Sequence, residues 1–140
     1  MIFVSPRQEQ EWSSPSLSPL LKQIVEEIAE YAVATWAWTF CVTSIFRTFS
    51  ENEAAEAKTM IHCYWRAVDI RTRGIDQAAV DDVTKWANAR WLYDPGRPAL
   101  PVLYSAPHGD GPHAHIQVHA ATALRPEAGS NSGPTSPAPA

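Results

Sequence analysis

The segment that most constrains the fold is residues 113–119, near the end of the chain. Polar side chains alternate there with small or apolar ones: His113, His115, Gln117 and His119 are separated by alanine, isoleucine and valine. An alternation with a period of two predicts a β-strand with one buried and one polar face. Because imidazole is the commonest metal ligand in proteins, the polar face of this strand is the first candidate for chemistry.

The rest of the pattern predicts an α+β fold. One helix is predicted to begin at Pro19 with Ser18 as its cap, and another to open at Asp76 and end at the turn 94–96. A short helical turn is expected after Ser50. The remaining strands are predicted over residues 36–46, 66–71 and 101–105. Since the last two strands are joined by a short loop, they must pair antiparallel. We therefore expect a small antiparallel sheet with helices packed on one side.

Length and composition indicate one domain with unstructured ends. The chain has 140 residues, of which 45% are hydrophobic and 19% are charged. We expect a loose N-terminal arm over residues 1–15, a domain over residues 16–123 and a disordered tail rich in Pro, Ser, Ala and Gly over residues 124–140. The net charge of −4 argues against a nucleic-acid partner, which needs a basic surface. No apolar run reaches the ~18 residues of a membrane span, so no membrane partner is expected either.

Two cysteines, Cys41 and Cys63, are too few for a disulfide framework, and the sequence leaves open whether they pair. The first residues lack the long apolar stretch of a secretory signal. We therefore expect a monomer made in the cytoplasm.

A second polar position lies on the strand predicted over residues 66–71. Asp69 shares a strand face with the small Ala67, and His62 lies just ahead of this strand. His62, Asp69 and one histidine of the last strand supply the three protein ligands of a catalytic zinc site, whose fourth position holds a water made acidic by the metal. The alternative is a solvent-exposed polar face without a metal, in which Asp69 pairs with Arg71.

The spacing within residues 62–69 resembles that of a known family. His62, Ala67 and Asp69 match the motif Ser-x-His-x-x-Gly-x-Ala-x-Asp of zinc peptidases with the Hedgehog/DD-peptidase fold. These include D-alanyl-D-alanine carboxypeptidases, D,D-dipeptidases, murein endopeptidases and phage L-alanyl-D-glutamate endolysins. Residues 113–117 resemble the terminal His-x-His motif of the family, and residues 44–47 resemble its Ser-x-Tyr-Arg element.

The resemblance implies a ligand set in two alternative alignments. In the first, His62, Asp69 and His115 hold the zinc, and His113 stabilises the transition state. In the second, Asp110 is the general base and His113 is the third ligand. Both alignments fit the sequence, which leaves the choice between them open.

The resemblance also assigns a role to Arg47 and marks two departures from the family. Arg47 matches the arginine that binds a substrate carboxylate. Trp65 stands where the family has glycine, and we expect it to reshape the loop or narrow the cleft. Met60 stands where the family often has serine.

The resemblance implies a zinc metallopeptidase that hydrolyses an amide bond of a peptidoglycan stem peptide. It further implies action at the cell wall and a phage or prophage origin. The alternatives are a non-catalytic zinc-binding module of the same fold, used for wall attachment or structure, and a small interaction domain without a metal. The sequence leaves open which peptide bond is cut, and two histidines with one carboxylate also suit other transition metals.

Overall fold

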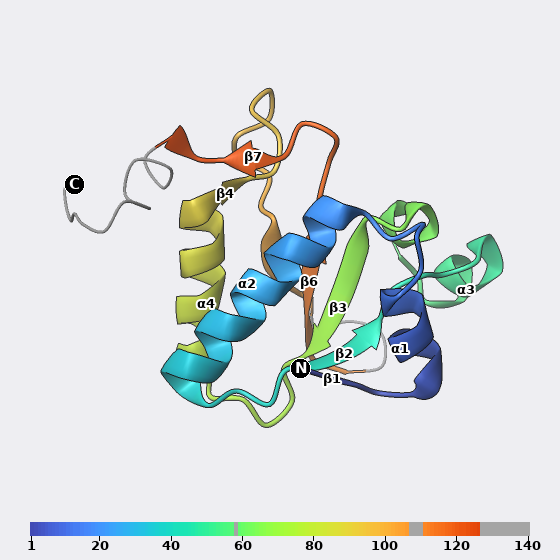
Figure 1. Ribbon diagram of the computed structural model, residues 1–140, viewed down its shortest axis with the longest axis horizontal. Helices are drawn as coiled ribbons and strands as arrows, with labels where there is room; N and C mark the ends of the chain where they lie inside the picture. Colours follow the sequence, from blue (N-terminus) through green and yellow to red (C-terminus); the bar gives the residue numbers. More distant parts are fainter. Residues whose placement is uncertain (58, 107–110, 127–140) are drawn as a thin grey trace.

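The computed structural model describes residues 1–57, 59–106 and 111–126 of the chain (Figure 1). Over these residues the fold is α+β, with four α-helices, one 3-10 helix (η1) and seven short strands. In chain order the elements are β1 (Ile2–Phe3), α1 (Pro6–Trp12), α2 (Pro19–Trp36), β2 (Cys41–Ser44), α3 (Phe49–Ala54), η1 (Ile61–Tyr64), β3 (Ala67–Arg71), α4 (Gln77–Arg90), β4 (Trp91–Leu92), β5 (Leu103–Ala106), β6 (His113–Gln117) and β7 (Ala123–Leu124).

A five-stranded sheet forms the centre of the molecule, with strand order β1-β2-β3-β6-β5. β2 with β3, β3 with β6, and β6 with β5 all pair antiparallel. The β5–β6 pairing confirms the prediction from the short loop between these two strands. β1 instead pairs parallel with β2, so the sheet is mixed rather than purely antiparallel. β4 and β7 form a separate antiparallel pair.

The two long helices cover one face of this sheet. α2 begins where the sequence predicts, because the Ser18 side chain accepts a hydrogen bond from the backbone N–H of Leu21 at 3.2 Å. Asp76 caps α4 in the same way through the N–H of Ala78, at 3.1 Å. The apolar stripes of both helices pack against the inward residues of β3 and β6. These inward residues are all buried: Val68, Ile70, Ala114 and Ile116.

The N-terminal residues are ordered, which corrects the expectation of a loose arm over residues 1–15. The backbone N–H groups of Ile2 and Val4 donate to the carbonyl groups of Phe40 and Val42, each at 2.9 Å. Trp12, at the end of α1, belongs to the buried core. A strand of two residues and one aromatic side chain thus dock a segment whose composition is largely polar.

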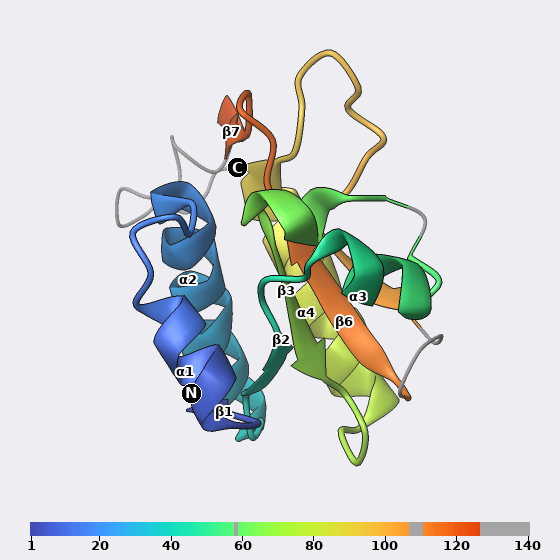
Figure 2. The same cartoon turned by 90° about the vertical axis from the view of Figure 1, so that its right-hand side faces the viewer.

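The helices also differ from the prediction, since they do not all lie on one side. Figure 2 shows α3 on the opposite side of the sheet from α2. α3 begins at Phe49 with Thr48 as its cap, rather than after Ser50. Thr48 and Glu51 form a reciprocal capping box, which fixes the helix start two residues earlier than expected.

The predicted strand over residues 36–46 is shorter in the structure, because α2 continues through Trp36 and ends at Ala37 in a left-handed conformation. The first residues of the expected tail are paired: Leu124 lies in β7, and the Arg125 N–H donates to the Arg90 carbonyl at 2.9 Å. The remainder of that tail, 127–140, lies outside the described residues.

Both cysteines are free thiols, Cys41 buried and Cys63 partly exposed. Within the described parts of the chain, none of the helices combines the length and the apolar character that crossing a membrane requires.

Candidate metal centre

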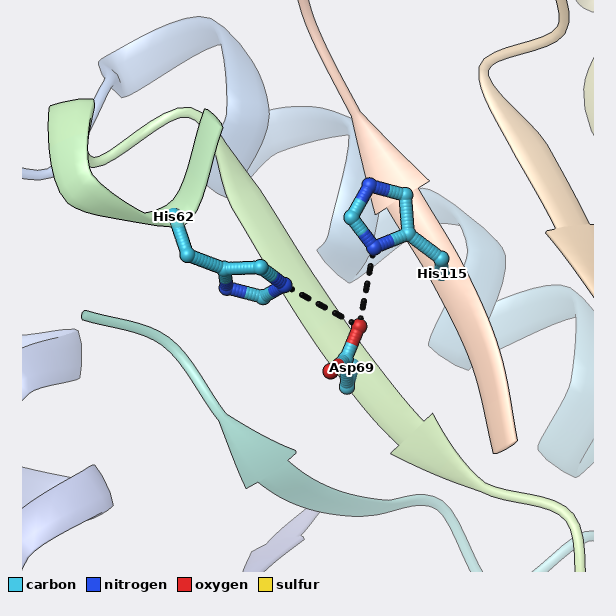
Figure 3. Close-up of side chains that lie close together, drawn as sticks. All are labelled: His62, Asp69 and His115. Carbon is cyan, nitrogen blue, oxygen red and sulfur yellow. Dashed lines mark hydrogen bonds and ion pairs between the residues drawn. The ribbon is translucent and has the colours of Figure 1, made fainter. Parts of the chain in front are cut away.

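Three elements bring His62, Asp69 and His115 together on the face of the sheet opposite α2 and α4. Asp69 is the middle residue of β3 and pairs directly with His115 of β6. Side chains of directly paired residues lie on the same face of a sheet. His62 reaches the pair from η1, the single turn that precedes β3 (Figure 3). One nitrogen of each histidine and one carboxylate oxygen lie within 4.8 Å of one another.

η1 ends at Trp65, the position at which the family resemblance expects glycine. Trp65 has φ 61° and ψ 35°, the left-handed conformation that glycine adopts most readily. Its ring stacks on Phe46, with centroids 4.6 Å apart and planes at 18°. A surface cavity of about 740 Å³ lies beside the cluster. Phe46 is among the described residues that line it, and Trp65 is not. Trp65 therefore does not narrow that cavity, and instead packs against the residue that forms its wall.

A hydrogen bond to the backbone commits one nitrogen of His62. Nδ1 lies 2.8 Å from the Ile45 carbonyl oxygen, which can only accept, so Nδ1 carries the proton and donates. Nε2 lies 3.2 Å from Oδ1 of Asp69. In the neutral imidazole, Nε2 therefore presents a lone pair to a carboxylate oxygen.

His115 is held in the equivalent way by Gln117. The Gln117 amide nitrogen donates to the Pro101 carbonyl at 3.0 Å, which turns Oε1 of the same amide toward His115. Nε2 of His115 lies 3.2 Å from Oε1 and donates to it. Nδ1 of His115, 2.9 Å from Oδ1 of Asp69, is then the nitrogen with the lone pair.

Three lone pairs thus converge on one point between His62 Nε2, His115 Nδ1 and Asp69 Oδ1. The three residues are buried, with exposed fractions of 2%, 6% and 3% for His62, His115 and Asp69. Water therefore does little to offset the free-energy cost of bringing these lone pairs together. A positive charge at this point would remove the repulsion between the lone pairs. It can be a second proton on each ring or a metal ion. Two imidazole nitrogens and one carboxylate oxygen are a usual set of three protein ligands for zinc. The group can therefore hold a metal ion.

Asp69 is kept ionised by its neighbours. Burial by itself raises the pKa of this carboxyl group. Hydrogen bonds from the His115 and His62 rings, which need a proton on the nitrogen that faces Oδ1, outweigh that effect and leave the pKa well below the ordinary value. A metal ion at the same point would favour the ionised carboxylate in the same way. Its second oxygen, Oδ2, accepts a hydrogen bond from Arg47 Nη2 at 2.8 Å. Arg47, expected to bind substrate, thus also orients Asp69 at the wall of the cavity.

His113 lies beside the cluster rather than within it. Its Nδ1 donates to the Gly111 carbonyl at 3.0 Å, and its Nε2 is 3.8 Å from Oδ2 of Asp69. His113 shares the polar face of β6 and lines the same cavity as Arg47. Asp110, the alternative general base, lies outside the described residues.

The cluster lies between two hollows in the surface. A cavity of about 740 Å³ is lined by Asp69 and His113 together with residues of β2 and α3. A second hollow, of about 430 Å³, is lined by Gln117 and Tyr104, among others. Asp69 lines the first hollow, and Gln117, the hydrogen-bond partner of His115, lines the second.

Two neighbours of His115 were not singled out from the sequence. Gln117 was placed on the polar face, but its bond to His115 follows from the Pro101 carbonyl, which no sequence pattern reveals. Tyr104 pairs with His115 across β5 and β6, and its ring stacks on the imidazole at 4.9 Å. The strand pairing would have indicated Tyr104 if the register of β5 had been known.

Comparison with protein-family models, with curated proteins and with solved structures finds no match for this chain. The geometry of the site and the spacing of its residues in the sequence are therefore what indicate a function for this chain.

Proposed function

We propose that this protein is a zinc metallopeptidase of the Hedgehog/DD-peptidase fold that hydrolyses an amide bond in a peptidoglycan stem peptide. The observation that carries the proposal is the convergence of His62 Nε2, His115 Nδ1 and Asp69 Oδ1. The second nitrogen of each ring is hydrogen-bonded to a carbonyl oxygen, that of Ile45 or of the Gln117 side chain. Catalytic zinc sites typically have histidines held in this way, since the second hydrogen bond fixes the tautomer and the ring orientation.

The order of the motifs supports the same family. The spacing from His62 to Asp69, the arginine at position 47 and the histidines of the last strand follow one another as in these peptidases. The left-handed backbone at Trp65 supports the resemblance independently, because it explains a glycine preference at that position. The antiparallel pairing of β3 with β6 brings the first and last motifs into contact.

The residues of the site divide the work of hydrolysis. His62, Asp69 and His115 would hold the zinc, which would supply Lewis acidity and activate a water molecule for attack on an amide. Arg47 holds Oδ2 of Asp69 and thereby fixes which carboxylate oxygen faces the histidines. His113 lines the cavity, and its Nδ1 is bound to the Gly111 carbonyl, so Nε2 is the atom that would hold a proton or stabilise negative charge on the substrate. This arrangement favours the alignment in which His115, rather than His113, is the third ligand.

The test combines metal analysis with hydrolysis of stem peptides. We expect about one zinc per chain in the purified protein, and loss of both zinc and hydrolysis in His62→Ala, Asp69→Ala and His115→Ala. His113→Ala should keep the zinc and lose most of the hydrolysis. His119→Ala is the matched control, since His119 lies beyond the end of β6, and it should keep both.

Two results would contradict the proposal. Absence of zinc from the wild-type protein after reconstitution would exclude the metal site, and hydrolysis that survives His62→Ala would exclude its role. Zinc binding without hydrolysis of any stem peptide would instead indicate the non-catalytic zinc-binding module.

A further inference from the structure

The larger cavity is unusually rich in arginine for this chain. The protein carries a net charge of −4 and has eleven lysines and arginines. Four of the eleven line this one cavity: Arg7, Arg47, Arg71 and Arg73. Three acidic residues, Glu51, Glu56 and Asp69, line the same cavity. Its lining therefore has a small excess of positive charge, which favours an anion beside any of the four arginines that is not paired with these acids.

Two of these arginines are occupied by carboxylates of the protein itself. Arg7 bonds to Glu11 at 2.7 Å and to Glu51 at 2.7 Å. Arg47 bonds to Asp69 at 2.8 Å. Neither guanidinium group is therefore a simple receptor for an external anion.

Arg71 differs from both. It is the last residue of β3 and is exposed, and within the described parts of the chain its side chain has no hydrogen bond or ion pair. It lies on the same strand face as Asp69, two residues further on, which separates their Cα atoms by about 6.6 Å. Its cross-strand partner is His113. Arg71 and His113 thus form the next cross-strand pair on this face, beside the pair Asp69 and His115 of the cluster.

We propose that Arg71 forms an anion subsite, separate from Arg47, that binds a free carboxylate of the peptide beside the bond to be cut. A planar guanidinium binds a carboxylate through two parallel hydrogen bonds, which gives the subsite both affinity and orientation. The ligand class is a peptide that contains a free α-carboxylate within the chain, as at a γ-linked glutamate, and not a peptide in which this group is a carboxamide. This inference rests on the proposed function for the identity of the ligand, and on the cavity and Arg71 for the subsite.

The test uses two matched peptides and the zinc-loaded protein. One is L-Ala-γ-D-Glu-L-Lys-D-Ala-D-Ala, and the other is the same peptide with the α-carboxyl group of D-Glu converted to the amide. We expect kcat/KM to be about tenfold or more higher for the acid than for the amide. In Arg71→Gln this ratio should fall to about one, and Arg71→Lys should keep part of it because the charge remains.

Lys85→Gln is the matched control, because it removes one positive charge from α4, on the covered side of the sheet. It should leave the ratio of acid to amide unchanged. A ratio that stays unchanged in Arg71→Gln as well would overturn the subsite while leaving the peptidase proposal intact.

Binding of the same peptides to zinc-stripped protein separates the two proposals further. Calorimetry that finds a preference for the acid, lost in Arg71→Gln, would support the subsite even if the loaded protein hydrolyses neither peptide. If the stripped and the loaded protein bind neither peptide, the subsite is overturned.

Discussion

The two faces of the same pair of strands differ in almost every property. On one face, Val68, Ile70 and Ile116 are buried under α2 and α4 and make only apolar contacts. On the other, Asp69 and His115 are also buried, but each is held by hydrogen bonds to polar partners. The apolar face stabilises the fold by removing surface from water, whereas the polar face holds groups whose burial is costly unless a cation balances them. Stability and chemistry are thus separated by the thickness of one sheet.

The largest expected effect tests the apolar face. Ile116→Ala removes a fully buried side chain from β6 and leaves a cavity, which should lower the free energy of unfolding by about 2–5 kcal/mol. Zinc content per folded molecule should not change, since the side chain points away from His115. Urea unfolding and metal analysis measure the two quantities. Loss of zinc from the folded variant would show that the two faces are not independent.

An intermediate effect is expected on the polar face, at Gln117. Gln117→Met removes the acceptor of His115 Nε2 and should weaken zinc affinity by about 10–100-fold, with a smaller effect on stability than Ile116→Ala. Gln117→Glu keeps an oxygen that can accept from His115 Nε2 but loses the donor to the Pro101 carbonyl. It should therefore retain more affinity than Gln117→Met and less than the wild-type protein. Competition with a chromogenic zinc chelator measures both variants. Equal affinity in Gln117→Met and the wild-type protein would exclude the proposed orientation of His115.

The smallest effect is expected at the rim of the cavity, where Arg7 of α1 bonds to Glu51 of α3. Its bond to Arg7 lowers the pKa of Glu51 from 4.5 to about 2. Because the folded-state pKa is the lower one, the stabilisation is complete above pH 4.5 and is lost as the pH falls toward 2. The pair is exposed, so we expect at most about 1 kcal/mol.

Urea unfolding of the wild-type protein and of Glu51→Gln should therefore differ at pH 6 and converge toward pH 2. Glu53→Gln, at an exposed position of the same helix, is the control. A difference between Glu51→Gln and the wild-type protein that stays constant with pH would argue against the ion pair.

The sequence predicts what local pattern determines. The starts of α2 and α4 follow from Ser18 and Asp76, and the alternation in residues 113–117 predicts which side of β6 is polar. The spacing between His62 and Asp69 also anticipated the cluster that can hold a metal. The two helix caps act within a few residues, and the alternation repeats with the period of the strand. The cluster is different, because His115 lies 46 residues beyond Asp69, and it was anticipated through the resemblance of the motifs to a known family.

What the sequence did not predict depends on distant partners. The parallel pairing of β1 rests on the carbonyl groups of Phe40 and Val42, about forty residues away in the chain. The orientation of Gln117 depends in the same way on the Pro101 carbonyl, sixteen residues away in the chain. The expectation of a loose arm over residues 1–15 was wrong because it rested on composition, which contains no information about these distant hydrogen-bond partners.

The position of β6 in the sheet determines when His62, Asp69 and His115 can come together during synthesis. β6 is the sixth strand in the chain but lies between β3 and β5, so the sheet has a gap until this strand is inserted. Asp69 and His115 are 46 residues apart in sequence. His62 and Asp69 therefore leave the ribosome well before their partner on β6. Pairing over this separation is slow compared with helix formation. The three side chains of the cluster should therefore come together late, as one of the final events of folding.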